Sequence, residues 1–386
     1  MADRISVRTG GTRTRDPRAA AGELFAALDQ PGIRFAVFYC SPDYDLPALA
    51  QALYQHFGDV NLIGCTTAGE ITPGGYVEGA LTGFSIASPD LDVYTQLIGL
   101  EPFDSAEVTR NAEAMSRRVS VRRGTPAGPA DTFAFLLTDG LAMQEEFLVS
   151  SIHQALHGIE LVGGSAADGT RFRATQLYYR GRFHERIALL TLVRGDFPFV
   201  AFRTQHFEKS DARMVVTRAD PVRRIVYEIN GLPAGPEFAR QIGLPLTGLT
   251  PLVFATHPVV VRVGGQYYVR SIARANPDGS LTFFCAIDTG IVLTIARGID
   301  LVQNLEDAFA KVQAKIGTPQ LVLGCDCILR HLEIQREGLE EPVSRIFRDN
   351  NVIGFATYGE QFNAMHLNQT LTGIAFATAM ETPEEL

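Results

Sequence analysis

The stretch Gly64-Cys-Thr-Thr-Ala-Gly-Glu-Ile71 organises the rest of the chain, because the pattern that leads into it occurs three times. The apolar run 35–39 is followed by a Ser-Pro-Asp loop, an amphipathic segment of helical period and the run 60–63, which enters this glycine-bearing turn. A second copy runs from residue 133 to the turn at 163–169, and a third, looser copy runs from residue 321 to 352–360. Three similar turns predict a functional site that is built from loops.

The length of the chain and its pattern of elements predict a mixed fold of two domains. A chain of 386 residues exceeds the usual domain size of roughly 100 to 200 residues. The expected fold class is α/β (α+β), with two mixed-sheet modules, helices packed on the sheets and internal strand-helix-strand repeats. A stretch rich in Gly and Pro at 230–236 indicates a boundary, with domains at 1–228 and 229–386. Helices near 300–315 and 343–348 are expected to close the second sheet.

Composition argues against a nucleic acid or a membrane as a partner. The net charge is −9, whereas phosphate binding needs a concentrated basic face. No apolar run approaches the roughly 20 residues of a membrane helix. The N-terminus lacks the positive-then-apolar layout of a signal peptide, which favours the cytoplasm. The five cysteines are odd in number and form no metal-ligand spacing, which favours buried, reduced thiols.

The turns at 64–70 and 162–168, together with the segment 355–373, resemble those of the FIST family of sensory proteins. The resemblance covers nearly the whole chain, with a FIST N-terminal sensory domain followed by a FIST C-terminal domain, and the two meet near 227–230. It implies a ligand sensor in signal transduction that is not an enzyme. The sequence contains no recognisable output module, so we expect the signal to pass to a separate partner, such as a histidine kinase of a two-component system. A homodimer is compatible with this interpretation.

The segment Tyr-Gly-Glu-Gln-Phe followed by Met-His-Leu-Asn-Gln-Thr resembles the haem-binding branch known as nitric oxide sensing proteins. This resemblance implies haem b, with His366 as the axial ligand of its iron and a diatomic gas as the signal. Met365 is an alternative axial ligand, although methionine is often core packing. A lone histidine is also often a hydrogen-bonded structural residue.

Further polar side chains in this part of the sequence are candidates for holding the cofactor or a ligand. Tyr358, Glu360 and Asn368 can orient a bound molecule or satisfy the backbone of their own turn. Arg270 can bind a haem propionate or another carboxylate, or can lie on a solvated strand edge.

The alternative to haem is a small metabolite, such as an amino acid. Cys65, Thr66, Glu70 and Asp168 are the expected ligand-binding residues in that case, since they lie in or beside the glycine-bearing turns. The carboxylates Glu70, Asp168 and Glu360 converge if the repeats stack about a common centre, or they cap the local backbone. No histidine is close in sequence to Cys65, so no catalytic dyad is predicted.

Overall fold

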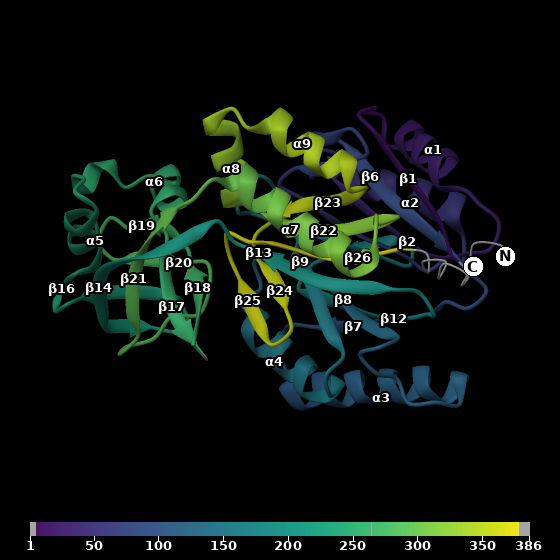
Figure 1. Cartoon of the computed structure of the whole chain (residues 1–386), viewed down its shortest axis with the longest axis horizontal. Coiled ribbons are helices and arrows are strands. Elements are labelled where there is room, and N and C mark those ends of the chain that lie inside the picture. Colours follow the sequence, from purple (N-terminus) through teal and green to yellow (C-terminus); the bar gives the residue numbers. More distant parts are fainter. Residues whose placement is uncertain (1–4, 264, 378–386) are drawn as a thin grey trace, which may run out of the picture.

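Three copies of one unit, each ending in a hairpin and a last strand, form the larger part of the molecule (Figure 1). The computed structural model describes residues 5–263 and 265–377. The first repeat contains β1 (Ser6–Thr12), α1 (Pro17–Leu28), β2 (Ile33–Cys40), α2 (Leu46–Phe57), β3 (Leu62–Thr66), β4 (Glu70–Thr72), β5 (Gly75–Val77) and β6 (Leu81–Ala87). The second contains β7 (Asp92–Gly99), α3 (Ser105–Arg123), β8 (Thr132–Thr138), α4 (Glu145–Leu156), β9 (Glu160–Ser165), β10 (Leu177–Tyr179), β11 (Arg182–His184) and β12 (Ile187–Arg194).

The third repeat has the same order of elements but contains an insertion. It consists of β13 (Phe199–Thr204), α7 (Leu301–Ile316), β22 (Leu321–Cys327), α8 (Ile328–Glu337), α9 (Glu340–Asp349), β23 (Val352–Thr357), β24 (Glu360–Phe362), β25 (Met365–Leu367) and β26 (Leu371–Phe376). Within each repeat the sheet order is the same: β1-β6-β2-β3, β7-β12-β8-β9 and β13-β26-β22-β23. The strand-helix-strand repeats expected from the sequence are therefore confirmed.

Residues 207–298, called here the inserted domain, form a separate sheet between β13 and α7. Its elements are β14 (Phe207–Asp220), β15 (Ile225–Ile229), β16 (Leu232–Pro233), α5 (Ala234–Ile242), the 3₁₀ turn η1 (Leu246–Gly248), α6 (Pro251–Thr256), β17 (Val259–Val263), β18 (Gln266–Arg270), β19 (Ile272–Ala275), β20 (Leu281–Phe283) and β21 (Val292–Gly298). The boundary proposed at 228/229 falls inside β15 of this sheet. In Figure 1 the inserted domain lies at one end of the molecule.

The mixed fold class is confirmed, but its sheets are arranged differently from the expected two modules. Four sheets are present in the described part of the chain. The helices expected near 300–315 and 343–348, α7 and α9, do not close the second module's sheet. They bury Leu305, Phe309 and Phe347 against the sheet of the third repeat. This expectation was wrong because hydrophobic periodicity shows that a helix has an apolar face, and does not show which sheet covers that face.

Each repeat places its hairpin in the sheet of another repeat. The hairpin β4-β5 of the first repeat pairs with β23 of the third, β24-β25 of the third pairs with β9 of the second, and β10-β11 of the second pairs with β3 of the first. The exchange is cyclic, so the three repeats are related by an approximate three-fold axis. Each sheet is therefore completed by a segment that is distant in the sequence.

The three sheets enclose one central core. Their inner faces contribute side chains such as Phe35, Phe84, Phe135, Leu189 and Phe355 to a single cluster. A second layer of buried side chains lies between each sheet and its own helices. Central strands are thus buried on both faces, which explains why their sequences are continuous apolar runs and do not alternate.

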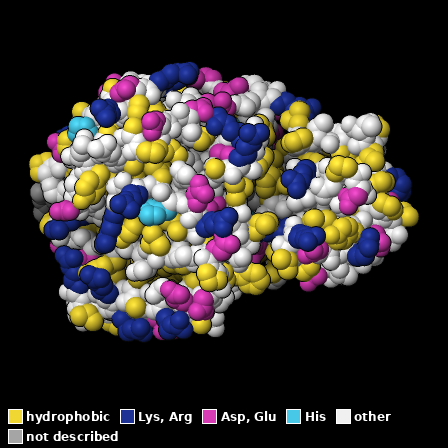
Figure 2. Space-filling view, turned by 180° about the vertical axis from the view of Figure 1, so that it is seen from behind, with side chains coloured by type: hydrophobic (Ala, Val, Ile, Leu, Met, Phe, Trp, Pro, Cys, Tyr) yellow, Lys and Arg dark blue, Asp and Glu magenta, His cyan; other side chains and the backbone are white. Residues whose placement is uncertain are grey.

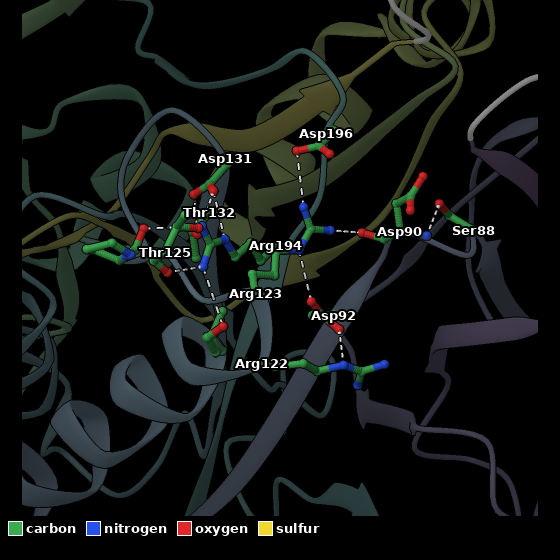
Figure 3. Close-up of polar contacts among 12 residues, drawn as sticks. Ser88, Asp90, Asp92, Arg122, Arg123, Thr125, Asp131, Thr132, Arg194 and Asp196 are labelled. Carbon is green, nitrogen blue, oxygen red and sulfur yellow. Dashed lines mark hydrogen bonds and ion pairs between the residues drawn. The ribbon is translucent and has the colours of Figure 1, made fainter.

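Charged side chains at the start and the end of the second repeat are paired with one another (Figure 3). Arg194, at the end of β12, is 2% exposed and donates to Asp131, to the hydroxyl of Thr125 and to backbone carbonyls. Arg123, at the end of α3, donates to Asp92 and Asp196. These charge-assisted hydrogen bonds fasten the end of α3 to the strand ends around it.

The described helices and the face shown in Figure 2 bear on the expected partners. Among the described residues, no helix combines the length and the apolar character that a membrane span requires. On the face shown in Figure 2, lysines and arginines are interspersed with aspartates and glutamates. The cytoplasmic location stays a prediction.

Candidate functional site

The three glycine-bearing turns meet at the three-fold axis and are joined by a closed ring of backbone hydrogen bonds. The amide of Ala68 donates to the carbonyl of Ala356 (3.0 Å), that of Tyr358 to Ser165 (3.2 Å), and that of Ala167 to Thr66 (2.9 Å). These three bonds link each turn to both of its neighbours. The loop-built centre predicted from the repeats is present in the structure.

Two glutamates occupy equivalent positions in the first and third turns. Glu70 accepts from the hydroxyl of Thr67 and from the amide of Ala80 at 2.9 Å. Glu360 accepts from the hydroxyl of Thr357 and from Thr370, whose hydroxyl lies at 2.8 Å. Burial raises the pKa of Glu70 to about 7 and that of Glu360 to about 8, although these hydrogen bonds oppose the shift.

All three repeats line a cavity of about 230 Å³ beside the first turn, called here the turn pocket. Its lining residues are Ser41, Pro42, Asp43, Thr67, Ala68, Gly69, Glu70, Glu78, Gly79, Gly169, Thr170, Arg171, Ile328, His331 and Leu332. At its mouth Arg171 pairs with Asp43 at 2.5 Å. Gly69 has a φ of +145°, a conformation that favours glycine, and this lets the turn pass close to His331.

His331 reaches the turn pocket from α8 of the third repeat because the first hairpin packs against that repeat. Its ring stacks on Tyr76 with a centroid separation of 4.2 Å, and its Nε2 lies 3.2 Å from Glu78 Oε1. Hydrogen bonding to His331 lowers the pKa of Glu78 to about 2. Glu78 and Asp43 therefore each pair with a basic side chain, whereas Glu70 forms no ion pair among the described residues.

Asp168 stabilises its own loop. Its carboxylate accepts the amides of Phe172 at 2.8 Å, Arg173 at 2.9 Å and Ala174 at 3.0 Å, and also the hydroxyl of Tyr358. Burial and this bond to Asp168 raise the pKa of Tyr358 well above its ordinary value. The ring of Tyr358 stacks on that of Phe172. These hydrogen bonds are those expected for local capping, the structural alternative for Asp168.

Thr66 and Cys65 are enclosed near the ring of turns but do not line the turn pocket. The hydroxyl of Thr66 accepts the amide of Gln176 at 3.1 Å. Cys65 is fully buried at the end of β3, and burial raises the pKa of its thiol well above the ordinary value. The thiol is therefore protonated and is shielded from solvent.

His366 lies where the third hairpin, α4 of the second repeat and the inserted domain meet. Its side chain is 2% exposed, and the backbone carbonyl of His366 accepts from Arg270 at 3.2 Å. Gln361 Nε2 lies 3.3 Å from His366 Nδ1. Burial lowers the pKa of His366, so the ring is neutral. His366 Nε2 and the side-chain amide of Asn368 have no hydrogen-bond partner within residues 5–263 and 265–377.

The packing around His366 does not fit a haem. A Cβ built on Gly359 would lie 2.2 Å from His366 Cε1 and 2.7 Å from Nε2, so the imidazole rests directly on the backbone of the third turn. Met365 precedes His366 on β25, and successive side chains of a strand point to opposite faces, so the two residues do not face the same side.

Nowhere in the described chain do three His, Cys, Asp or Glu side chains gather to hold a metal ion.

Several residues of the turn pocket were missed by sequence reasoning. Asp43, Glu78, Arg171 and His331 come from three repeats, and the exchanged hairpins bring them together. Only Glu78 could have been found from the sequence. It follows Glu70 of the first turn by the same number of residues as Asn368, a predicted site residue, follows Glu360 of the third turn. No local pattern links His331 to Gly69, which is more than 250 residues away in the sequence.

The chain belongs to the FIST family. The FIST N domain matches residues 34–232 and the FIST C domain matches residues 237–363. FIST domains are associated with sensing in signal transduction. The haem-binding branch has no support from these matches. An uncharacterized protein of Methanocaldococcus jannaschii is 23% identical over 372 residues, which cover 86% of this chain and 70% of that protein.

The expectation that the chain is not an enzyme is contradicted by a solved structure. A cyanuric acid hydrolase from A. caulinodans matches 97% of this chain and 100% of its own, with a TM-score of 0.41 and 9% identity. The likeness is too weak to assign any activity to this chain.

Proposed function

We propose that this FIST protein senses a small ligand that carries an ammonium group, such as an amino acid, in the turn pocket. The observation that carries the proposal is Glu70, a buried carboxyl that lines a cavity made by all three repeats and forms no ion pair in the described structure, since Arg171 and His331 pair with Asp43 and Glu78. An ammonium group beside Glu70 supplies the missing charge. Arg171, which is half-exposed at the mouth, is placed to donate hydrogen bonds to a ligand carboxylate.

Binding and proton release are coupled in this proposal. The ammonium group binds the ionised form of Glu70, and the pKa of that carboxyl is raised by burial to about 7. Below pH 7 most of the protein must lose a proton before it binds. We therefore expect the apparent affinity to fall by about tenfold for each pH unit below 7, and to level off above it.

The first test is a thermal-shift and calorimetric screen of the twenty amino acids, with methylamine as an ammonium-only probe. A ligand present at 100 times its Kd stabilises the folded state by about 2.7 kcal/mol, which is a measurable shift in Tm. Glu70→Gln is expected to weaken binding by at least tenfold. The matched control is Glu360→Gln, because Glu360 is buried in the equivalent turn but lies outside the turn pocket. Equal loss in both variants, or no binding of any probe to the wild type, contradicts the proposal.

Output through a separate signalling protein, such as a histidine kinase, is part of the same proposal. The support is the position of α8, which lines the turn pocket with Ile328 and His331 and also contacts α6 of the inserted domain. A ligand that favours one position of α8 shifts the population of arrangements of the inserted domain, which a partner can detect.

Haem at His366 is the competing candidate, and the spectrum of the protein distinguishes the two. We expect haemin added to the purified protein to give no absorption band that depends on His366, because the imidazole is packed on Gly359. The comparison is between the wild type and His366→Ala, titrated with haemin under reducing and oxidising conditions. A Soret band that is present in the wild type and shifted or lost in the variant favours haem.

A further inference from the structure

Several buried polar atoms have no hydrogen-bond partner where the inserted domain contacts the third turn. Five side chains from adjoining segments define this region, called here the cap site: Gln361, His366, Asn368, Gln369 and Ser271. Six of their polar atoms are buried without a hydrogen-bond partner in the described structure, namely Gln361 Oε1, His366 Nε2, Asn368 Nδ2 and Oδ1, Gln369 Oε1 and Ser271 Oγ. Buried polar groups are paired in the great majority of cases, so this concentration requires an explanation.

The hydrogen bonds of Gln361 determine which ring nitrogen of His366 carries the proton. Gln361 Nε2 lies 2.9 Å from Ser165 Oγ and 3.3 Å from the carbonyl oxygen of Gly359, which can only accept, so this nitrogen is a donor. His366 Nδ1, 3.3 Å away, therefore faces a donor and is the ring nitrogen without a hydrogen. His366 Nε2 therefore carries the hydrogen of the neutral ring. His366 Nε2 and Asn368 Nδ2 both lie over Gly359, since a Cβ built there would be 2.7 Å and 3.2 Å from them.

The charges around the cap site balance. Arg224 of the inserted domain donates to both Glu145 and Glu146 of α4 at 2.6 Å, and Arg270 donates to the backbone carbonyl of His366. Two carboxylates and two guanidinium groups leave no net charge, which disfavours a charged occupant.

The inserted domain covers this region and is fastened there by directional contacts. Besides the Arg224 pairs, Glu146 accepts the amide of Ala286 at 2.5 Å, and Gln369 Nε2 donates to the carbonyl of Ala255 at 2.6 Å. The ring of Phe172 lies between those of Tyr358 and Phe284, at centroid separations of 4.5 Å and 5.7 Å. A molecule held at the cap site would therefore touch both the third repeat and the inserted domain.

We infer that the cap site is a second binding site, distinct from the turn pocket, which takes a small uncharged molecule that both donates and accepts hydrogen bonds, as a carboxamide does. His366 Nε2–H, the Asn368 amide and the Ser271 hydroxyl supply donors, and the amide oxygens of Gln361, Gln369 and Asn368 supply acceptors. A single buried water makes about three hydrogen bonds, so one water does not satisfy the six atoms.

The test uses the full chain with ¹⁵N-labelled histidine and three probes of similar size: acetamide, acetate and methylammonium. We expect acetamide at millimolar concentrations to shift the ring nitrogen signals of His366 and to raise Tm, while acetate and methylammonium leave those signals unchanged. The spectrum of the free protein should show the hydrogen on Nε2. Unchanged His366 signals with all three probes, which is the result if the site holds only water, or equal shifts with all three, overturns the inference.

His366→Phe is the informative variant, because the second repeat carries Phe183 at the equivalent position of its hairpin and shows that the fold accepts this side chain there. We expect at least a tenfold loss of acetamide affinity in His366→Phe, measured by thermal shift. Glu70→Gln should leave acetamide binding unchanged, and His366→Phe should leave ligand binding in the turn pocket unchanged. The two proposals can thus fail independently. Undiminished acetamide binding in His366→Phe also overturns the inference.

Discussion

Replacing Arg330 with alanine is expected to lower the free energy of unfolding by about 3–5 kcal/mol, the cost of leaving a buried charge without its partner. Arg330 on α8 and Asp326 on β22 are both fully buried, with Nε and Oδ1 2.6 Å apart. Tyr76 of the exchanged hairpin donates to the other oxygen of Asp326 at 3.0 Å. Arg330 Nη1 lies 2.7 Å from Nδ1 of His206, at the entry to the inserted domain. The loss of Arg330 therefore affects three parts of the molecule.

Urea denaturation of the wild type and Arg330→Ala measures this loss directly. The matched control is Arg336→Ala on the same helix, where the side chain is 47% exposed and its Nε lies 3.5 Å from Oε1 of Glu337. An exposed pair of this kind contributes at most about 1 kcal/mol. The prediction fails if the two substitutions cost the same.

The second large effect is a dependence of stability on pH that two buried carboxyls cause. Burial raises the pKa of Glu360 to about 8 and that of Glu70 to about 7, from an ordinary value of 4.5. The folded state then holds protons that the unfolded state has already released. Stability from these groups is complete below about pH 4.5 and is lost as the pH rises to about 8. Each unit of pKa difference corresponds to about 1.4 kcal/mol, so the total change is several kcal/mol.

Glu360→Gln isolates this contribution. The variant cannot ionise at residue 360, so we expect it to be more stable than the wild type at pH 9. At pH 5 it is expected to be slightly less stable, because a Gln Nε2 placed where Glu360 Oε2 lies cannot accept from Thr370. Urea denaturation at pH 5, 7 and 9 should show this change of sign. The exposed Glu306→Gln on α7 serves as the control, with no such change. A difference between Glu360→Gln and the wild type that stays constant across these pH values contradicts the prediction.

The sequence predicted the repeated unit and the meeting of its turns, because both depend on local patterns. The run 35–39 and its two counterparts are buried on both faces, which makes them continuous and recognisable. Similar glycine-bearing turns at 64–70 and 354–360 then had to lie at equivalent ends of equivalent sheets. The ring formed by Ala68, Ala167 and Tyr358 follows from that similarity.

The sequence does not predict which sheet each hairpin joins. Strands of three residues, such as β4 and β24, carry almost no periodicity of their own, and long-range packing decides which sheet they join. The same limit hid His331 and Arg171, which reach the turn pocket from other repeats. The second sheet was expected from the sequence, but its insertion into the third repeat was not, because the strands of that sheet resemble those of any half-buried sheet.

Because the hairpins are exchanged cyclically, none of the three repeats forms a complete sheet by itself. A fragment that lacks the third repeat would leave the edge of β9 without β24, and its own hairpin β4-β5 would have no sheet to join. Exposed strand edges of this kind promote aggregation. Proteolytic cleavage between repeats followed by separation of the pieces should therefore yield insoluble fragments, whereas a nicked chain that stays assembled should keep its shape.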